Sequence, residues 1–227
     1  MISATRVGLP RWEGEGPTMV SARGSIYAPL NLHGRRVILR TLSDADYAGW
    51  LEVRQRCHDW LVKWEPRSAH STHLAEDQRS FVSRCAIRER ERQMGTGFGF
   101  GIFYEGRFVG EITLSSIQRG PLQSAFIGYW IDEAVAGRGL MPEAVVTVLQ
   151  FSFESLNLHR IEINIIPRNA ASRRVVEKLG LRFEGIAERY LEIDGAWEDH
   201  ARYAVTAEEW RDRAPELVAN WLLPTSD

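Results

Sequence analysis

The 227-residue sequence has few of the features that mark secreted, membrane-bound or nucleic-acid-binding proteins. Its two cysteines, Cys57 and Cys85, stand far apart and form neither a disulfide framework nor a metal pair, which indicates free thiols. No apolar run reaches the ~20 residues that span a bilayer, and the Gly- and Pro-containing stretch 8–29 lacks the apolar core of a signal peptide. A formal net charge of −2 gives no general attraction to nucleic acid or membranes. We therefore expect a cytoplasmic protein with no direct nucleic-acid or membrane partner.

Length and composition indicate one globular domain. Apolar residues make up 44% of the chain and charged residues 26%, which is ordinary, and the chain is long enough for one core. Residues 1–30 are expected to form an extension, residues 31–212 the domain and residues 213–227 a tail. The apolar residues of the tail are predicted to pack back on the body: Leu217, Val218, Trp221, Leu222 and Leu223.

The most informative stretch runs from Ala125 to Gly180. Its pattern predicts a strand at 125–131, a glycine turn at 132–139, a helix from Leu140 to Leu156 with one apolar face, a strand at 161–166 and a helix capped by Asn169. Gly137 and Gly139 permit positive φ, and the turn leads into a helix N-terminus, a combination that suits a phosphate. The stretch has no Gly-Lys-Ser/Thr, no third glycine at the dinucleotide spacing and no acidic residue closing the second strand. P-loop and nicotinamide sites are therefore excluded.

The remaining pattern predicts a largely antiparallel sheet. Expected elements are a strand at 36–41, helices after Ser43 and over 74–93, a hairpin of 98–104 with 107–117 joined at Glu105-Gly106, and a hairpin turning at Asp194-Gly195. The charged run from Arg88 to Arg92 is predicted to be a solvated helix face. His70 and His73 have no carboxylate or thiol nearby, so no metal site is predicted.

Several segments, taken as a set, are similar to the GNAT N-acetyltransferases and in particular to their RimJ/RimL branch. They are Gly128-Tyr-Trp-Ile, Gly137-Arg-Gly-Leu-Met, His159-Arg-Ile, Pro167-Arg-Asn-Ala-Ala-Ser, Leu179-Gly-Leu-Arg-Phe-Glu-Gly and Tyr190-Leu-Glu-Ile-Asp-Gly-Ala-Trp-Glu-Asp-His. The resemblance covers residues 36–210. It implies an α/β (mixed α+β) GNAT-like fold, with a largely antiparallel sheet, a central splayed parallel strand pair and helices on both faces.

The same resemblance implies acetyl-CoA as co-substrate and no metal. The leading Gln/Arg of the family's turn is Ala134 here, which leaves the backbone amides of residues 135–140 for the pyrophosphate. Main-chain atoms at the splayed strands are expected to hold the pantetheine arm. The expected cofactor-binding residues are Trp130, Ile131, Asp132, Val135, Ala136, Gly137, Arg138, Gly139, Leu140, Asn169 and Ser172.

Acetyl transfer to an amine needs a proton acceptor for the amine and stabilisation of the departing thiolate, but no covalent intermediate. Glu111, on a strand beside the expected cofactor strand, is our first candidate for the base, with Glu192 and His200 as rivals. The tyrosine that many family members use as acid is replaced by Val176. By resemblance to the RimJ/RimL branch, Ser172 becomes the candidate acid or thiolate stabiliser. The walls of the acceptor pocket are expected to include Tyr190, Trp197 and His200.

The branch resemblance implies acetylation of the α-amino group of a protein N-terminus of the Ala/Ser type, with a ribosomal protein as candidate acceptor. Two alternatives stay open: a small-molecule amine acetyltransferase acting on a polyamine, amino acid or antibiotic, and a non-catalytic acetyl-CoA-binding module. A strongly acidic cleft would favour a polyamine, and an open neutral groove would favour a peptide. The protein is expected to be a monomer or a homodimer.

Overall fold

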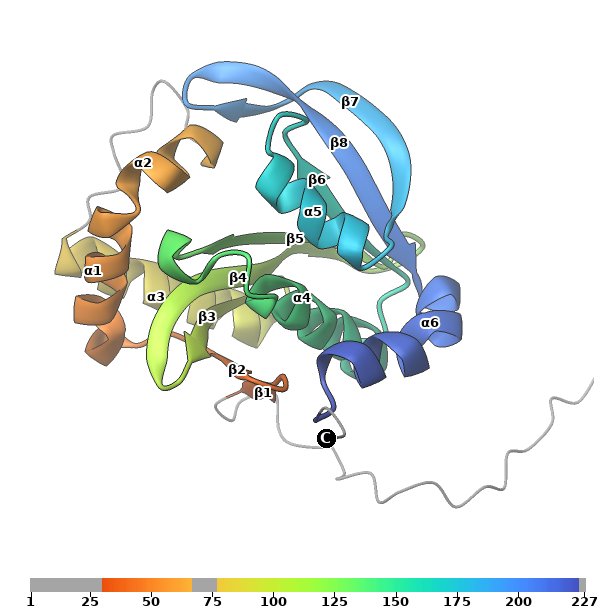
Figure 1. Ribbon diagram of the computed structural model, residues 1–227, viewed down its shortest axis with the longest axis horizontal. Helices are drawn as coiled ribbons and strands as arrows, with labels where there is room; N and C mark the ends of the chain where they lie inside the picture. Colours follow the sequence, from red (N-terminus) through yellow and green to blue (C-terminus); the bar gives the residue numbers. More distant parts are fainter. Residues whose placement is uncertain (1–29, 67–76, 225–227) are drawn as a thin grey trace, which may run out of the picture.

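A computed structural model describes residues 30–66 and 77–224, so the predicted extension, His70, His73 and the start of the helix expected at 74 lie outside the described residues. An eight-stranded sheet in the order β1-β2-β3-β4-β5-β6-β8-β7 forms the centre of the molecule (Figure 1). The strands are β1 (Asn31–His33), β2 (Val37–Arg40), β3 (Phe98–Tyr104), β4 (Arg107–Gln118), β5 (Ser124–Ile131), β6 (Arg160–Ile165), β7 (Arg182–Ile193) and β8 (Ala196–Thr206). All neighbouring strands are antiparallel except β5 and β6, as the GNAT-like fold requires.

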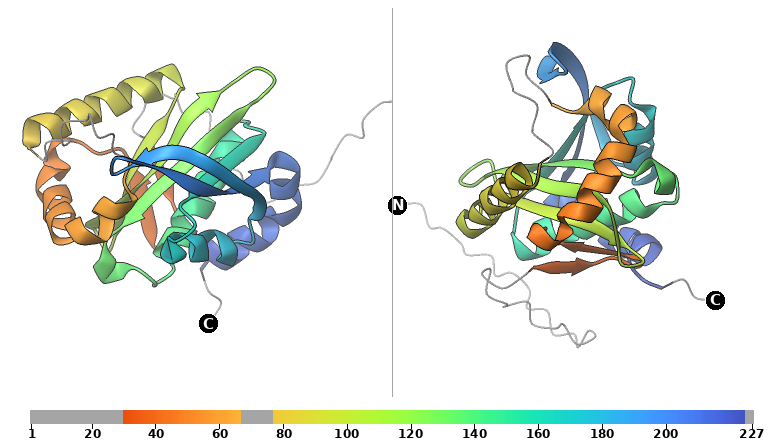
Figure 2. Two further views of the ribbon diagram at one scale, coloured as in Figure 1. Left: turned by 90° about the horizontal axis from the view of Figure 1, so that it is seen from above. Right: turned by 90° about the vertical axis from the view of Figure 1, so that its left-hand side faces the viewer.

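Helices cover both faces of the sheet (Figure 2). They are α1 (Tyr47–Arg56), α2 (His58–Leu61), α3 (Gln78–Met94), α4 (Leu140–Gln150), α5 (Ala170–Lys178) and α6 (Ala207–Trp221). The larger apolar cluster joins the sheet to α4, α5 and α6, while a smaller one, which includes Trp50 and Phe81, joins the sheet to α1, α2 and α3. This arrangement confirms the mixed α/β architecture predicted from the sequence.

The parallel pair β5/β6 separates along its length. The two strands pair only between residues 124–126 of β5 and 160–162 of β6. Beyond that point β5 continues to Ile131 paired with β4 alone, and β6 continues to Ile165 paired with β8 alone. The predicted splay is therefore present, and it leaves one edge of each strand facing a gap in the sheet.

Helix α4 differs from its sequence prediction. Every residue from Leu140 to Leu149 is buried, whereas the pattern predicted one apolar face. The sheet, through β1, β2 and β4, covers one side of α4, and α5 and α6 cover the others, so the helix has no solvent-facing stripe. It is followed by one turn of π-helix, Phe151–Ser155, where the prediction continued the α-helix to Leu156.

The structure confirms the predicted hairpin turns and the predicted cap of α5. Glu105 and Gly106 connect β3 to β4 with φ of 50° and 75°, and Asp194 and Gly195 connect β7 to β8 with φ of 49° and 81°. These positive values explain why the two loops contain Asp-Gly or Glu-Gly. Asn169 caps α5, since its side chain accepts a hydrogen bond from the amide of Ser172 at 3.1 Å.

The C-terminal residues pack on the body through α6. Leu217 is buried and Val218, Trp221 and Leu222 are partly buried against the main core, whereas Leu223 is 52% exposed. Because α6 begins at Ala207, the expected boundary between residues 212 and 213 falls inside a helix. Among the described residues, no helix combines the length and apolar character needed to cross a bilayer.

An ion-pair network of arginines and glutamates connects β6 to β7. The Glu184 carboxylate accepts hydrogen bonds from Arg160 Nη1 at 3.0 Å and from Arg182 Nη1 at 2.5 Å. The hydrogen bond from Arg160 is the largest cause of the lowering of the Glu184 pKa from 4.5 to about 2; burial opposes it, and the hydrogen bond from Arg182 adds to the lowering. Its ionised form therefore stabilises the native state above pH 4.5, and this contribution is lost as the pH falls toward 2.

Replacing Glu184 by glutamine is expected to lower the free energy of unfolding by up to about 1 kcal/mol at pH 6, because solvent screens this partly exposed ion pair. At pH 2.5 the difference between wild type and Glu184→Gln should shrink, since the wild-type carboxylate is then being protonated. Urea unfolding at both pH values measures the two differences. A difference that stays constant or grows toward low pH would contradict this account.

Candidate active site

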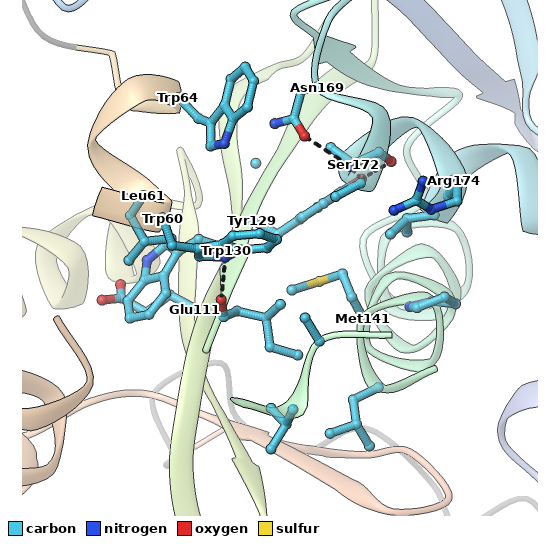
Figure 3. A pocket seen from close by; sticks show the side chains of 18 of the residues that line it. Trp60, Leu61, Trp64, Glu111, Tyr129, Trp130, Met141, Asn169, Ser172 and Arg174 are labelled. Atoms are coloured by element: carbon cyan, nitrogen blue, oxygen red, sulfur yellow. Dashed lines mark hydrogen bonds between the residues drawn. The ribbon is translucent and has the colours of Figure 1, made fainter. Parts of the chain in front are cut away.

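A cavity of about 580 Å³ lies where β5 and β6 separate (Figure 3), within the size range of small-ligand sites. Its walls come from α2 and the residues after it, from β4 and β5, from the glycine turn with the start of α4, and from α5. Most of the residues predicted from the sequence to bind the cofactor or act in catalysis are brought together here. Those that line the cavity are Glu111, Trp130, Ile131, Val135, Ala136, Gly137, Gly139, Leu140, Asn169 and Ser172.

The glycine turn has the backbone conformation that the sequence predicted. Gly137 and Gly139 both have φ of +81°, and Gly139 is the N-terminal cap of α4. The amides of Val135 and Ala136, however, donate to the carbonyls of Asp132 and Glu133, each at 3.2 Å. Anion contacts expected from residues 135–140 would therefore fall to Gly137 and the amides after it, where the first helical turn has no internal acceptors.

The buried carboxylate of Glu143 connects the glycine turn to the β1–β2 connection through hydrogen bonds. Glu143, in the first turn of α4, is 0% exposed and accepts hydrogen bonds from the amide of Val37 and from Arg36 Nε, both at 2.9 Å. Arg36 in turn donates through Nη1 to the carbonyl of Arg138 at 3.1 Å. On the other side, a Cβ at Gly139 would lie 3.4 Å from the Trp221 ring of α6. The turn is thus held by the β1–β2 connection and by the last helix.

Asp132 has a structural role that the sequence did not indicate. Its carboxylate accepts from Arg56 Nη2 at 2.6 Å, from the Cys57 thiol at 3.3 Å and from the amide of Ala134 at 3.0 Å. Burial raises the pKa of Asp132, but the Ala134 amide and Arg56 outweigh it and lower the pKa below its ordinary value. Its own amide donates to Val109 at 2.8 Å, and it does not line the cavity, which corrects the predicted main-chain contact of Asp132 with the cofactor.

The Glu111 side chain lines the cavity but is only 1% exposed. It accepts a hydrogen bond from Trp50 Nε1 at 2.8 Å, pairs with Arg84 at 3.2 Å and bonds to Arg88 Nη1. Burial alone would raise the pKa of Glu111, but the charges of Arg88 and Arg84 outweigh burial and hold it below its ordinary range. The carboxylate is therefore ionised throughout the neutral range.

The arginine run of α3 is not the solvated face that the sequence predicted. Arg88 turns inward to Glu111 and lines the cavity, and Arg92 is 5% exposed, paired with Glu89. Arg90 and Glu91, in contrast, are exposed. Arg88 thus has a buried partner and Arg92 is itself buried, and a single sequence could not indicate which arginines would turn inward.

Ser172 and Tyr129 face each other across the cavity wall (Figure 3). Ser172 Oγ donates to the Tyr129 hydroxyl at 3.0 Å, and that hydroxyl donates to the carbonyl of Ser172 at 3.2 Å. Burial raises the pKa of Tyr129, with partial compensation from the Ser172 hydrogen bond. Tyr129 therefore stays protonated at every physiological pH.

Aromatic and apolar side chains form the end of the cavity nearest to α2: Trp60, Leu61, Trp64, Pro66 and Trp130. Trp60 Nε1 donates to the carbonyl of Ile131 at 3.2 Å, which fixes its ring against β5. Glu65, the acidic residue at this end, pairs with Arg54. Within the described chain, both carboxylates that line the cavity, Glu65 and Glu111, are thus neutralised by arginines.

The β7–β8 hairpin reaches this end without lining it. Ile193 forms an isolated bridge with Pro66, and Arg168, paired with Glu198 of β8 at 2.6 Å, lies 5.6 Å from the centre of the Trp64 ring. These contacts join the hairpin to the chain after α2 (Figure 1).

The predicted wall residues on the hairpin do not line the cavity. His200 is 3% exposed with its ring 5.5 Å from that of Tyr190, and Trp197 is 64% exposed. The pairing of β7 with β8 also shifts register between Ala187 and Leu191. Any contact of these three residues with an acceptor remains a prediction, as does a role of Glu192 as base.

Sequence reasoning missed the residues that the fold brings to the cavity from elsewhere, notably Tyr129, Arg88, Trp60 and Trp64. A signal existed only for Tyr129, which belongs to the Gly-Tyr-Trp-Ile segment that carried the family resemblance. Arg138, expected at the cofactor, contributes its carbonyl to Arg36 and does not line the cavity. Among the described residues, no three His, Cys, Asp or Glu side chains are grouped as a metal would require.

Comparison with known proteins identifies this architecture. Residues 36–182 match the model of the acetyltransferase (GNAT) domain. A probable N-acetyltransferase of Bacillus subtilis, YjcK, is 37% identical over 77% of this chain and 96% of its own length. The ribosomal protein uS5-alanine N-acetyltransferase of Escherichia coli K12 is 30% identical over 77% of this chain and 90% of its own length. Mycobacterium smegmatis RimJ, solved in complex with CoA-disulfide, superposes with a TM-score of 0.77 at 34% identity, over 85% of this chain and 93% of that one. The chain belongs to the GNAT family of N-acetyltransferases, among relatives of the RimJ/RimL type.

Proposed function

We propose that the enzyme transfers the acetyl group of acetyl-CoA to the α-amino group of a protein N-terminus of the Ala/Ser type, with a ribosomal protein as candidate acceptor. The observation that carries the proposal is the cavity at the splayed strands. It runs from the glycine turn to an aromatic end whose carboxylates are paired with arginines. The names of the relatives support both the cofactor and the class of acceptor.

Acetyl-CoA would lie with its pyrophosphate at Gly137 and Gly139 and its pantetheine arm in the gap between β5 and β6. Backbone groups at the unpaired edges of these strands can bond to the amides of the arm. Arg174 and Lys178 of α5 also line the cavity and add positive charge for phosphate groups. The thioester would then point toward Ser172 and Glu111, between the two ends of the cavity.

The low pKa of Glu111 bears on which amine the enzyme can use. An α-amino group has a reference pKa near 8, so about a tenth of it is neutral at pH 7, whereas a lysine-type amine is neutral in fewer than about one molecule in a thousand. A carboxylate held ionised by two arginines is a weak base. It suffices to take a proton, through water, from the acidic ammonium of a tetrahedral intermediate. It is poorly suited to deprotonating a polyamine.

The charges in the cavity lining also argue against a polyamine acceptor. A polyamine site needs unpaired carboxylates, but Glu65 and Glu111 have arginine partners, and Arg88, Arg174 and Lys178 are also in the lining. Apolar walls from Trp60, Trp64 and neighbouring residues suit the small side chain at the start of a peptide. We therefore favour a peptide acceptor over a polyamine.

The proposal predicts that CoA release will be at least about tenfold faster with peptides beginning Ala or Ser than with spermidine or free amino acids. Purified enzyme, acetyl-CoA and a panel of such peptides, with Thr- and Met-initiated peptides alongside, provide the measurement. A peptide blocked at its N-terminus is the matched control and should give only the background rate.

Two results would contradict the proposal. Turnover confined to small amines would assign the enzyme to small-molecule acetylation. Tight binding of acetyl-CoA without turnover on any acceptor would leave the cofactor site intact but remove the proposed reaction.

A further inference from the structure

Tyr129 lies on β5 at the edge of the gap, with its ring in the cavity wall and its hydroxyl directed at the start of α5 (Figure 3). Ser172 holds this hydroxyl through two groups, its Oγ at 3.0 Å and its carbonyl at 3.2 Å. Position 176, one turn further along α5, is a fully buried valine that cannot donate a hydrogen bond. The phenol hydroxyl near the start of α5 is therefore supplied by Tyr129 of β5 and not by a residue of α5 itself.

We propose that Tyr129 positions the Ser172 hydroxyl and polarises it toward the sulfur of departing CoA, so that the two hydroxyls act together on the leaving group. The inference rests on the proposed function, because it requires the CoA sulfur to lie near Ser172. Tyr129 acts through Ser172 and is a positioning residue.

The chemistry follows from the hydrogen-bonding capacity of two hydroxyls. In the structure Ser172 Oγ donates to Tyr129, and Tyr129 donates to the carbonyl of Ser172. Each hydroxyl has one hydrogen and two acceptor lone pairs, and rotation about its C–O bond redirects the hydrogen. When the C–S bond of the tetrahedral intermediate breaks, its electron pair stays on sulfur. Ser172 Oγ can then donate to the thiolate while accepting from Tyr129.

No proton has to leave Tyr129 in this step. The acceptor amine loses one proton as the new amide forms, and that proton finally neutralises the CoA thiolate, so the reaction balances. Burial raises the pKa of Tyr129, which keeps it a donor throughout. Hydrogen bonds in such a chain polarise one another, so Ser172 becomes a stronger donor to sulfur than an isolated serine.

The pKa of the thiol of CoA bound to the full-length enzyme tests this inference without any acceptor. It is obtained by following thiolate absorbance in the ultraviolet as the pH is raised. In the wild type it should lie below that of free CoA, and Ser172→Ala should remove most of the shift. Tyr129→Phe should weaken thiolate formation about three- to tenfold, which is the effect of one hydrogen bond. Arg174 and Lys178 also line the cavity and affect the thiol equally in every variant.

The design includes a double variant and a matched control. In the Ser172→Ala background, Tyr129→Phe should change the pKa of the bound CoA thiol very little. A residue that acts only through the Ser172 hydroxyl has no effect once that hydroxyl is removed. Tyr203→Phe is the control, since Tyr203 is buried and interacts with Arg173 of the same helix but does not line the cavity. The pKa of the CoA thiol bound to Tyr203→Phe should equal that of the CoA thiol bound to the wild type.

With a peptide acceptor, kcat of Tyr129→Phe should fall by the same factor while the KM for acetyl-CoA stays within about twofold. The inference is overturned if the thiol pKa in Tyr129→Phe equals that of the wild type, if the two substitutions act additively, or if Tyr203→Phe has the same effect. Failure of the wild-type enzyme to bind CoA would overturn the proposed function as well. Binding of CoA with no thiol shift would overturn this inference alone.

Discussion

Glu111→Gln is expected to lower kcat with a peptide acceptor by about 100-fold or more, with the KM for acetyl-CoA nearly unchanged. The carboxylate lines the cavity but is not part of the glycine turn, so its loss should remove proton transfer without removing the pyrophosphate contacts. Steady-state kinetics with both substrates varied provide the measurement. This result would support Glu111 as the base over Glu192 and His200.

The same substitution also disturbs a buried ion cluster, and the two effects must be separated. Removing the charge leaves Arg84 and Arg88 without their carboxylate, which costs about 3–5 kcal/mol in comparable buried pairs. Arg84→Met is the matched control, because it breaks the same cluster at 3.2 Å but keeps the carboxylate. Both variants should be assayed well below their melting temperatures. If Arg84→Met loses as much activity as Glu111→Gln, the effect is structural and Glu111 is not the base.

The pH profile gives a second, independent reading of Glu111. Because Arg88 and Arg84 hold the pKa of Glu111 below its ordinary range, the group is already ionised at pH 5 and above. The kcat/KM for the peptide should then rise only with deprotonation of the free α-amino group, near pH 8. An additional ionisation in the profile would instead indicate a base other than Glu111.

Gly137→Ala is expected to raise the KM for acetyl-CoA at least about tenfold, because one misdirected amide removes a hydrogen bond to a charged group. Gly137 has φ of +81°, which costs an alanine about 1–2 kcal/mol, so the turn should relax away from this conformation. A Cβ at this position meets nothing within 4 Å, so no steric clash complicates the result. Isothermal titration with CoA and steady-state kinetics measure the change.

Gly106→Ala is the matched control for this experiment. Gly106 also has positive φ, +75°, and its Cβ would also meet nothing within 4 Å, but it lies in the β3–β4 turn outside the cavity lining. Both variants should lose similar stability, and only Gly137→Ala should lose cofactor affinity. Equal binding by the two variants would show that the glycine turn does not contact the pyrophosphate.

Features that depend on a few neighbouring residues were predictable from the sequence. The turns at Glu105-Gly106 and Asp194-Gly195, the cap at Asn169 and the positive φ at Gly137 each follow from local backbone preferences. The splayed strands were also predicted correctly, but through the family resemblance and not through any pattern within the strands.

Features that depend on distant partners were not predictable. The charged residues of α3 look alike in sequence, and only the position of Glu111 on β4 selects Arg88 as an inward residue. The tryptophans after α1 reach the cavity because α2 is directed toward β5, where Trp60 finds the Ile131 carbonyl. The register shift between Ala187 and Leu191 in the β7–β8 hairpin is likewise absent from any local sequence signal, because it depends on how β7 pairs with β8.

The contacts that hold the glycine turn determine when, during synthesis, the chain can first bind its cofactor. Arg36 reaches the turn from near the start of the described chain, and Trp221 reaches it from α6, close to its end. During synthesis the turn emerges from the ribosome well before α6 does, so the nascent chain holds a cofactor turn with one of its two supports still missing. Folding that depends on contacts between residues so distant in sequence is also slow. We therefore expect the capacity to bind the cofactor tightly to be among the last properties that this chain acquires as it is made.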